Sequence, residues 1–238
     1  MTMLVEHRAD GPVATITLNR PDAGNRLTNA MAGLLGAALE QSREARVIVL
    51  RGAGADFCAG RDMQPPAAGS NVKPADVMRD DAEPMLALLA TFRSCTQPII
   101  CVAQGKAWGI GSVFAGIADV TLATSDATFR LGELERGIPP CLAMSALLDA
   151  MPRKALGYLV YSAEPMPAEA ALAAGLISAV VPADALETRL QAFMARLLSF
   201  PPTAVTAVKQ YLASAPSGDA EAAAVLGASM LCNVLASR

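Results

Sequence analysis

Three segments decide the fold of this chain: DFCAGRDM at residues 56–63, GKAWGIG at residues 105–111 and FRLGELERGIP at residues 129–139. The first follows an apolar run at 47–50 and the second follows one at 98–103, as is typical of buried strands. Glycine after a strand lets the main chain turn sharply and lets a ligand approach it closely. The second segment also opens a helix, whose first N–H groups have no partner within the helix. We therefore expect two loops whose N–H groups hold an oxygen that becomes negatively charged.

These glycines do not form a nucleotide-binding motif. Gly109-Ile110-Gly111 fails as a dinucleotide fingerprint because Phe114 stands where the third glycine or alanine belongs. No acidic residue ends a partner strand about twenty residues further on, and there is no GxxxxGKS or GxxxxGKT sequence of a P-loop. The segment indicates a site built from the main chain instead.

The rest of the chain predicts an α/β core followed by helices. Residues 3–7 and 13–18 flank Asp10-Gly11-Pro12 and predict a β-hairpin, and Thr28 predicts the N-cap of a helix that ends near Ser42. The prolines of 64–76 indicate a surface loop. Further strands are expected at 98–102, 119–123 and 178–181, and further helices at 77–94, 141–150, 153–161, 167–174, 184–198, 202–213 and 219–235. This order favours an α/β core at 1–185 and a C-terminal helical region at 186–238.

Composition narrows the classes of function. The 238 residues are 53% hydrophobic and 17% charged, which suits a folded domain and excludes a disordered chain. A net charge of −3 argues against a nucleic-acid partner. No apolar run approaches the roughly 20 residues that a membrane span needs, and no secretory signal is visible. Five cysteines without a CxxC pair indicate reduced thiols in a cytoplasmic protein.

The inventory of catalytic side chains is short. The single histidine, His7, lies in the first predicted strand, so a Ser-His-Asp triad is not expected. No set of histidine and cysteine ligands indicates a metal site. Catalysis should therefore rest on carboxylates, on main-chain dipoles, or on both.

The ordered set of motifs resembles the enoyl-CoA hydratase/isomerase, or crotonase, superfamily over residues 4–213. The resemblance rests on the three opening segments and on further positions in consistent order: Leu18-Asn19-Arg20-Pro21, Asp119, Glu133, Gly137, Pro139, Ala173-Ala174-Gly175-Leu176-Ile177 and Val180-Val181-Pro182. It implies a crotonase-like spiral of ββα units with a helical C-terminal region that forms a homotrimer or a dimer of trimers. It further implies an acyl-CoA thioester as substrate, with no cofactor beyond the coenzyme A that the substrate carries.

The same resemblance assigns roles to residues. The N–H groups of Arg61 and Ile110 match the two donors that hold the thioester oxygen, and Glu133 matches a catalytic glutamate. Glu135 is a second candidate, because in an extended segment it would share the side of Glu133. The implied substrate- and CoA-binding positions are Gly24, Arg26, Leu27, Ala59, Asp62, Met63, Trp108, Gly109 and Val113. For Asp62 a turn-stabilising role is the better interpretation, and Trp108 either walls the acyl pocket or packs in the core.

One departure from the hydratase pattern points to the reaction. The resemblance implies that the family's hydratases use two glutamates. The position of the first glutamate matches Val113 here, and its aliphatic side chain can neither donate nor accept a proton. A single carboxylate beside two N–H donors suits proton shuttling, so we expect a shift of the double bond from 3-enoyl-CoA to 2-enoyl-CoA. The alternatives are an enoyl-CoA hydratase, another enolate reaction such as decarboxylation or C–C cleavage, and a catalytically silent acyl-CoA-binding protein. The C-terminal helix is expected to be shorter than is usual in the family, which bears on CoA affinity.

Overall fold

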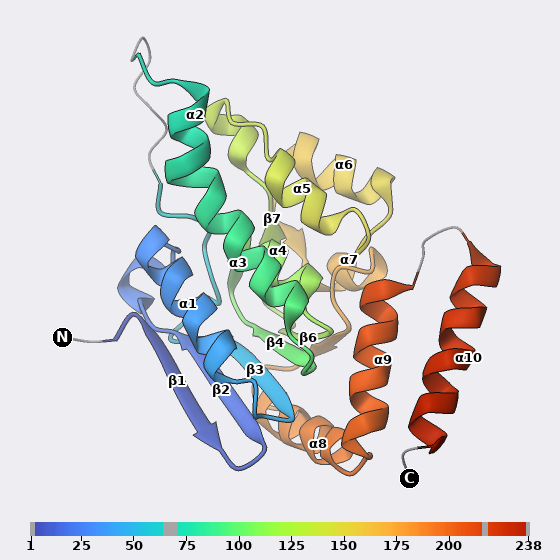
Figure 1. Ribbon diagram of the computed structural model, residues 1–238. Helices are drawn as coiled ribbons and strands as arrows, with labels where there is room; N and C mark the ends of the chain where they lie inside the picture. Colours follow the sequence, from blue (N-terminus) through green and yellow to red (C-terminus); the bar gives the residue numbers. More distant parts are fainter. Residues whose placement is uncertain (1–2, 64–70, 216–218, 237–238) are drawn as a thin grey trace.

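The computed structural model describes residues 3–63, 71–215 and 219–236. It is built around a six-stranded sheet in the order β1-β2-β3-β4-β6-β9 (Figure 1). Its strands are β1 (Val5–Asp10), β2 (Val13–Leu18), β3 (Val47–Gly52), β4 (Ile99–Ala103), β6 (Val120–Thr124) and β9 (Ala179–Val181). The predicted hairpin is confirmed, because β1 and β2 pair in antiparallel fashion around Gly11, and every other neighbouring pair in this sheet is parallel. Strand β4 is fully buried and β3 is buried except at Arg51, as expected for central strands covered on both faces.

Helices connect the parallel strands and cover one face of the sheet. The crossover from β2 to β3 holds the short 3-10 turn η1 (Pro21–Ala23) and α1 (Asn29–Gln41), and that from β3 to β4 holds α2 (Pro74–Val77), η2 (Met78–Ala82) and α3 (Glu83–Ser94). Thr28 caps α1 as predicted, its hydroxyl accepting from the N–H of Met31 at 3.1 Å. The second crossover becomes helical at Pro74, three residues earlier than predicted, since proline suits the first turn of a helix. Residues 64–70 of the predicted loop lie outside the described residues.

A second, three-stranded sheet was not predicted from the sequence. Its strands are β5 (Lys106–Trp108), β7 (Thr128–Arg130) and β8 (Met166–Pro167), in the order β5-β7-β8. Between the two sheets lies α4 (Ile110–Ile117), whose first six residues are buried. The ring of Phe114 on α4 stacks on that of Phe92 on α3, with centroids 5.3 Å apart. This packing fixes α4 against the helical layer.

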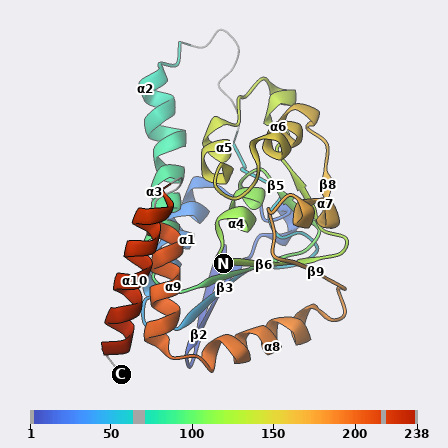
Figure 2. The ribbon, with the colours of Figure 1, turned by 90° about the vertical axis from the view of Figure 1, so that its right-hand side faces the viewer.

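Helices dominate the chain after β7, as predicted (Figure 2). They are η3 (Glu133–Arg136), α5 (Cys141–Leu147), α6 (Arg153–Ser162), α7 (Ala168–Ala173), α8 (Leu186–Leu198), α9 (Pro202–Ser214) and α10 (Ala220–Ala236). Helix α5 ends three residues before the predicted position 150. Helix α8 covers the second face of the main sheet, where Leu190 and Met194 pack on residues of β3 and β4. Among the described residues, none of the helices has both the length and the apolar content to cross a lipid bilayer.

Helix α9 is tied to the sheet by a largely buried ion pair. Lys209 Nζ lies 2.6 Å from Asp119 Oδ2, with 10% and 18% of the two side chains exposed. The same carboxylate oxygen accepts from the N–H of Ile99 at 2.7 Å. Asp119 therefore joins the start of β4 to the start of β6 and to α9. Helix α10 packs against α9 and has no buried residue among those described.

Candidate active site

The loops that follow β3 and β4 meet at one edge of the sheet, because parallel strands direct their carboxyl ends to the same side. A short parallel bridge joins them. The N–H of Cys58 donates to the carbonyl of Lys106 and the N–H of Trp108 donates to the carbonyl of Cys58, both at 2.9 Å. The bridge holds the first two motif segments side by side, as the sequence predicted for a shared site.

The first candidate donor is the N–H of Arg61. A second bridge pairs this residue with Leu27, in which the N–H of Leu27 donates to Gly60 and the N–H of Asp62 donates to Leu27. In this parallel register the neighbours of Arg61 make the hydrogen bonds, and its own N–H makes none within the described part of the chain. Gly60 turns the main chain into this position with φ +113°, a value that side-chain-bearing residues rarely adopt.

The second candidate donor is the N–H of Ile110, the first residue of α4. Gly109 precedes it with φ +52° and ψ −118°, and the N–H of Gly109 donates to the carbonyl of Arg130 at 2.7 Å. The N–H of Ile110 is one of the unpaired groups at the start of the helix, where the helix dipole also favours negative charge. A Cβ atom on residue 109 would lie 3.3 Å from Gly60 Cα, so the two donor loops are in contact.

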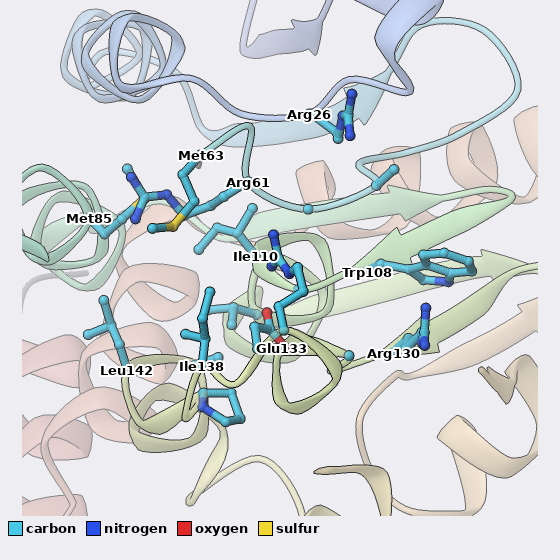
Figure 3. Close-up of a pocket in the computed structure, with 18 of the residues that line it drawn as sticks. Arg26, Arg61, Met63, Met85, Trp108, Ile110, Arg130, Glu133, Ile138 and Leu142 are labelled. Carbon is cyan, nitrogen blue, oxygen red and sulfur yellow. The ribbon is translucent and has the colours of Figure 1, made fainter. Parts of the chain in front are cut away.

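A cavity of about 360 Å³ opens beside these two donors (Figure 3). One part of its wall is apolar, formed by Met63, Met85, Leu89, Val113, Ile138, Pro139, Pro140, Leu142 and Ala143. The rest is formed by the donor loops, by four arginines and by two glutamates. In the close-up, Glu133 lies between the apolar side chains and Trp108 with Arg130. The third motif segment therefore faces the first two across the cavity.

Glu133 is the first residue of the 3-10 helix η3 and is half-buried. A Cβ atom on residue 109 would lie 3.0 Å from its Oε1, so the carboxylate reaches the donor loops. Its Oε2 atom is buried and has no hydrogen-bond partner among the described residues. Burial raises the pKa of Glu133, while the charges of Arg136 and Arg130 oppose this shift. A carboxyl group with a raised pKa and a free oxygen can take up and return a proton.

A sequence profile described as enoyl-CoA hydratase/isomerase matches residues 8–237 of this chain. The chain belongs to the enoyl-CoA hydratase/isomerase family. It is 37% identical over 202 residues to a probable enoyl-CoA hydratase of Rhodobacter capsulatus, covering 83% of this chain and 76% of that protein. It is 33% identical over 205 residues to the 2,3-dehydroadipyl-CoA hydratase of Escherichia coli, covering 84% and 78%. The crystal structure of an enoyl-CoA hydratase of Mycobacterium smegmatis superposes with a TM-score of 0.89 at 26% identity, covering 98% and 91%.

In this member of the enoyl-CoA hydratase/isomerase family, the surroundings of Val113 and Glu135 indicate how many carboxylates of the cavity are free to exchange a proton. Val113 is fully buried on α4 one turn after Ile110, and it lines the cavity with its aliphatic side chain. Glu135 is exposed and forms an ion pair with Arg130. The segment is a 3-10 helix and not extended, so residue 136, three positions on, shares the side of Glu133. The extended segment that would place Glu135 on the side of Glu133 is therefore absent, but Glu135 also lines the cavity and stays a second candidate.

Six of the nine binding positions inferred from the family resemblance line the cavity. They are Arg26, Ala59, Met63, Trp108, Gly109 and Val113. The other three are not among the residues that line the cavity. Gly24 accepts a hydrogen bond from the N–H of Ala59, and the side chain of Leu27 is buried in the core. Asp62 is paired with Arg20, which lowers the pKa of the aspartate; this contact spans 42 positions, so a local turn-stabilising role stays a prediction.

Sequence reasoning missed the part played by Arg130. Its Nε donates to the carbonyl of Ala163 at 2.6 Å, its guanidinium pairs with Glu135, and its Cζ lies 5.2 Å from the centre of the Trp108 ring. Its carbonyl oxygen also fixes Gly109. Arg130 thus connects the carboxylate-bearing η3 to the donor loop. No local pattern around an arginine in a three-residue strand could have indicated these contacts.

The described residues offer no metal centre, because no three His, Cys, Asp or Glu side chains among them converge. Cys58 lies beneath the donor loops, and burial raises the pKa of its thiol to about 12. It is therefore a protonated packing residue near neutral pH. The chemistry available in the cavity comes from two main-chain donors and one unpaired carboxyl group.

Proposed function

We propose that this protein isomerises 3-enoyl-CoA thioesters to 2-enoyl-CoA thioesters. The observation that carries the proposal is the carboxylate arrangement of the cavity. Glu133 is its unpaired carboxyl group, whereas Glu135 is held by Arg130 and the aliphatic Val113 occupies the wall. Addition of water needs a group that places and activates the water molecule as well as a proton donor. Moving one proton between two carbon atoms needs a single acid–base group.

The proposed reaction balances on Glu133 alone. The thioester oxygen accepts hydrogen bonds from the N–H groups of Arg61 and Ile110, which makes the protons on C2 more acidic. The Glu133 carboxylate removes one of these protons, and the C2–H electrons form a dienolate whose oxygen the two N–H groups stabilise. The Glu133 carboxyl group then returns the proton to C4, so the double bond moves from C3–C4 to C2–C3 and the enzyme regains its carboxylate.

Residues suited to bind the coenzyme A and acyl parts of the substrate support the same proposal. Arg26 lines the cavity and is exposed, and its guanidinium has no hydrogen-bond or ion-pair partner among the described residues, so it is available to a phosphate of coenzyme A. The apolar wall that includes Met85 and Leu142 suits the acyl chain. No redox or metal-dependent step enters this scheme.

A second candidate is hydration of 2-enoyl-CoA, because several relatives of this chain are named hydratases. A panel of 2-enoyl-, 3-enoyl- and malonyl-type CoA esters, assayed with wild type and Glu133→Gln, separates the candidates. Isomerisation that falls by about 10²–10⁴-fold in the variant supports the proposal. Isomerisation that survives the substitution contradicts it, and appreciable hydration of crotonyl-CoA favours the second candidate. Binding of esters without turnover would indicate a silent acyl-CoA-binding protein.

We also propose that the protein self-associates through its C-terminal helices. Several large apolar side chains on α9 and α10 are exposed, namely Val208, Leu212, Val225, Leu231 and Leu235. Such an apolar face is unusual on a monomer, and the family resemblance predicts a homotrimer or a dimer of trimers. Sedimentation equilibrium of wild type and of Leu212→Glu tests this. A wild-type protein that is monomeric at micromolar concentration refutes it.

A further inference from the structure

The cavity carries more positive charge than its carboxylates balance. Four arginine side chains line it: Arg26, Arg61, Arg130 and Arg136. Arg130 is paired with Glu135, and the Arg61 guanidinium donates to Asn29 at 2.8 Å and lies 3.7 Å from Asp81. The guanidinium groups of Arg26 and Arg136 make no hydrogen bond or ion pair with any residue that the structure describes, although the main chain of Arg26 is hydrogen-bonded to Ala23 and Arg20. Two guanidinium groups of the site are therefore available to a ligand.

Arg136 is the one that accompanies the acid–base group. It is the last residue of η3 and follows Glu133 by three positions, and residues at this spacing are eclipsed in a 3-10 helix. The N–H of Ile138 donates to the carbonyl of Glu133 at 3.1 Å, which closes this turn against the cavity wall. Burial raises the pKa of Glu133, and the positive charge of Arg136 opposes this shift. Glu133 and Arg136 both line the cavity, so the cation and the candidate acid–base group face the same space.

Arg26 occupies a different place. It follows η1 and lies across the cavity from Glu133 (Figure 3), and its charge acts on Asp62. The pantetheine arm of coenzyme A separates the thioester from the phosphates. When the reacting carbon is at Glu133, the group beside Arg136 is consequently part of the acyl chain and not a phosphate.

We propose that Arg136 binds a carboxylate on the acyl group, so that the preferred substrates are CoA thioesters of unsaturated dicarboxylic acids. This inference rests on the proposed function and specifies its substrate class. A guanidinium offers paired N–H donors that match a carboxylate. Arg136 is exposed and lines the same cavity as Ile138 and Leu142, so a neutral acyl chain there would gain nothing from the guanidinium, whereas a carboxylate would form an ion pair with it.

The test compares two substrates of equal length, 3-hexenedioyl-CoA with a terminal carboxylate and 3-hexenoyl-CoA without one. We expect wild type to show the higher kcat/KM for the dicarboxylic ester. Arg136→Gln should lower the ratio of the two kcat/KM values by about tenfold, as for loss of a charge-assisted hydrogen bond at a partly exposed site. Arg136→Lys should restore part of the ratio. The matched control is Arg189→Gln on α8, an exposed arginine outside the cavity lining, and it should leave the ratio unchanged.

Two results would overturn the inference while leaving the isomerase proposal intact: a wild-type preference for the neutral ester, or an equal change for both esters in Arg136→Gln. If neither ester is isomerised, the proposed function fails, and binding then decides the inference separately. In that case adipoyl-CoA should bind more tightly than hexanoyl-CoA by calorimetry, and Arg136→Gln should remove the difference. Equal affinities of wild type for these two esters would refute the role of Arg136.

Discussion

Substitution of Gly109 by alanine should remove activity by placing a methyl group in the middle of the site. A Cβ atom there would lie 3.0 Å from Glu133 Oε1 and 3.3 Å from Gly60 Cα, closer than ordinary van der Waals contact. The methyl group would push the carboxylate away from the donors and disturb the turn that presents the N–H of Ile110. Loss of one such donor typically costs about 10²–10³ in kcat. We expect Gly109→Ala to lose at least about 10²-fold in the isomerisation assay.

The same substitution also carries a conformational cost, which a matched control separates from the obstruction. Gly109 has φ +52°, and forcing alanine into such a conformation costs about 1–3 kcal/mol. For a chain of this size that corresponds to a fall in Tm of roughly 2–12 °C. Gly11 has φ +55° in the β1–β2 turn, and a Cβ atom there meets nothing within 4 Å. Gly11→Ala should lose comparable stability by differential scanning fluorimetry and keep its kcat/KM.

The result that would refute this reasoning is a Gly109→Ala protein whose kcat/KM stays within about twofold of wild type. Near-normal activity would mean that the reacting carbon does not approach the space between Gly109, Gly60 and Glu133. It would also mean that the N–H of Ile110 is not a donor to the substrate, since the preceding turn controls its direction.

Three further predictions concern charge. Because burial raises the pKa of Glu133, its contribution to stability is present at low pH and is lost as pH rises through its folded-state pKa. Glu133→Gln should therefore raise the Tm relative to wild type by more at pH 7 than at pH 4, and an equal increase at both pH values contradicts this. The kcat/KM of wild type should rise with pH as Glu133 loses its proton, with a midpoint above the usual pKa of 4.5. Arg130→Gln should move that midpoint upward, because it removes a positive charge that lowers the pKa of Glu133; a downward movement rejects the assignment. Lys209→Met should lower the free energy of unfolding, measured with urea, by about 3 kcal/mol, because the largely buried Asp119 carboxylate keeps only its hydrogen bond from the N–H of Ile99. A decrease below about 1 kcal/mol would show that the ion pair is dispensable.

Much of the fold followed from local sequence patterns because the large elements carry strong ones. The apolar run of β3, the Thr28 cap and the Gly11 turn each act over a few residues, and each was recognised. The second sheet was missed because β5 and β7 have three residues each and β8 has two. Elements this short show no periodicity, and their existence depends on where α4 and the main sheet place the chain.

Only part of the site was predicted from the sequence, because short elements also shape it. Glycines at strand ends indicated the donor loops, and Glu133 was inferred from the family resemblance and not from any pattern of its own. The third segment was treated as extended, whereas it folds as the 3-10 helix η3. In an extended segment Glu135 would share the side of Glu133, whereas in the 3-10 helix Arg136 does. A four-residue helix between Gly132 and Gly137 carries no signal that separates it from an extended turn.

The main-chain donors also have a consequence for how this protein can change over generations. No single substitution at positions 61 or 110 deletes a donor except one to proline, which alone lacks an N–H. The side chain at position 61 is not needed for donation, because the guanidinium of Arg61 is bound to Asn29 and Asp81, whereas the side chain at position 110 must still fit the core. If the proposed function holds, mutations can alter the walls of the cavity while the two main-chain donors persist. Substrate range could then change over generations without loss of the proposed reaction.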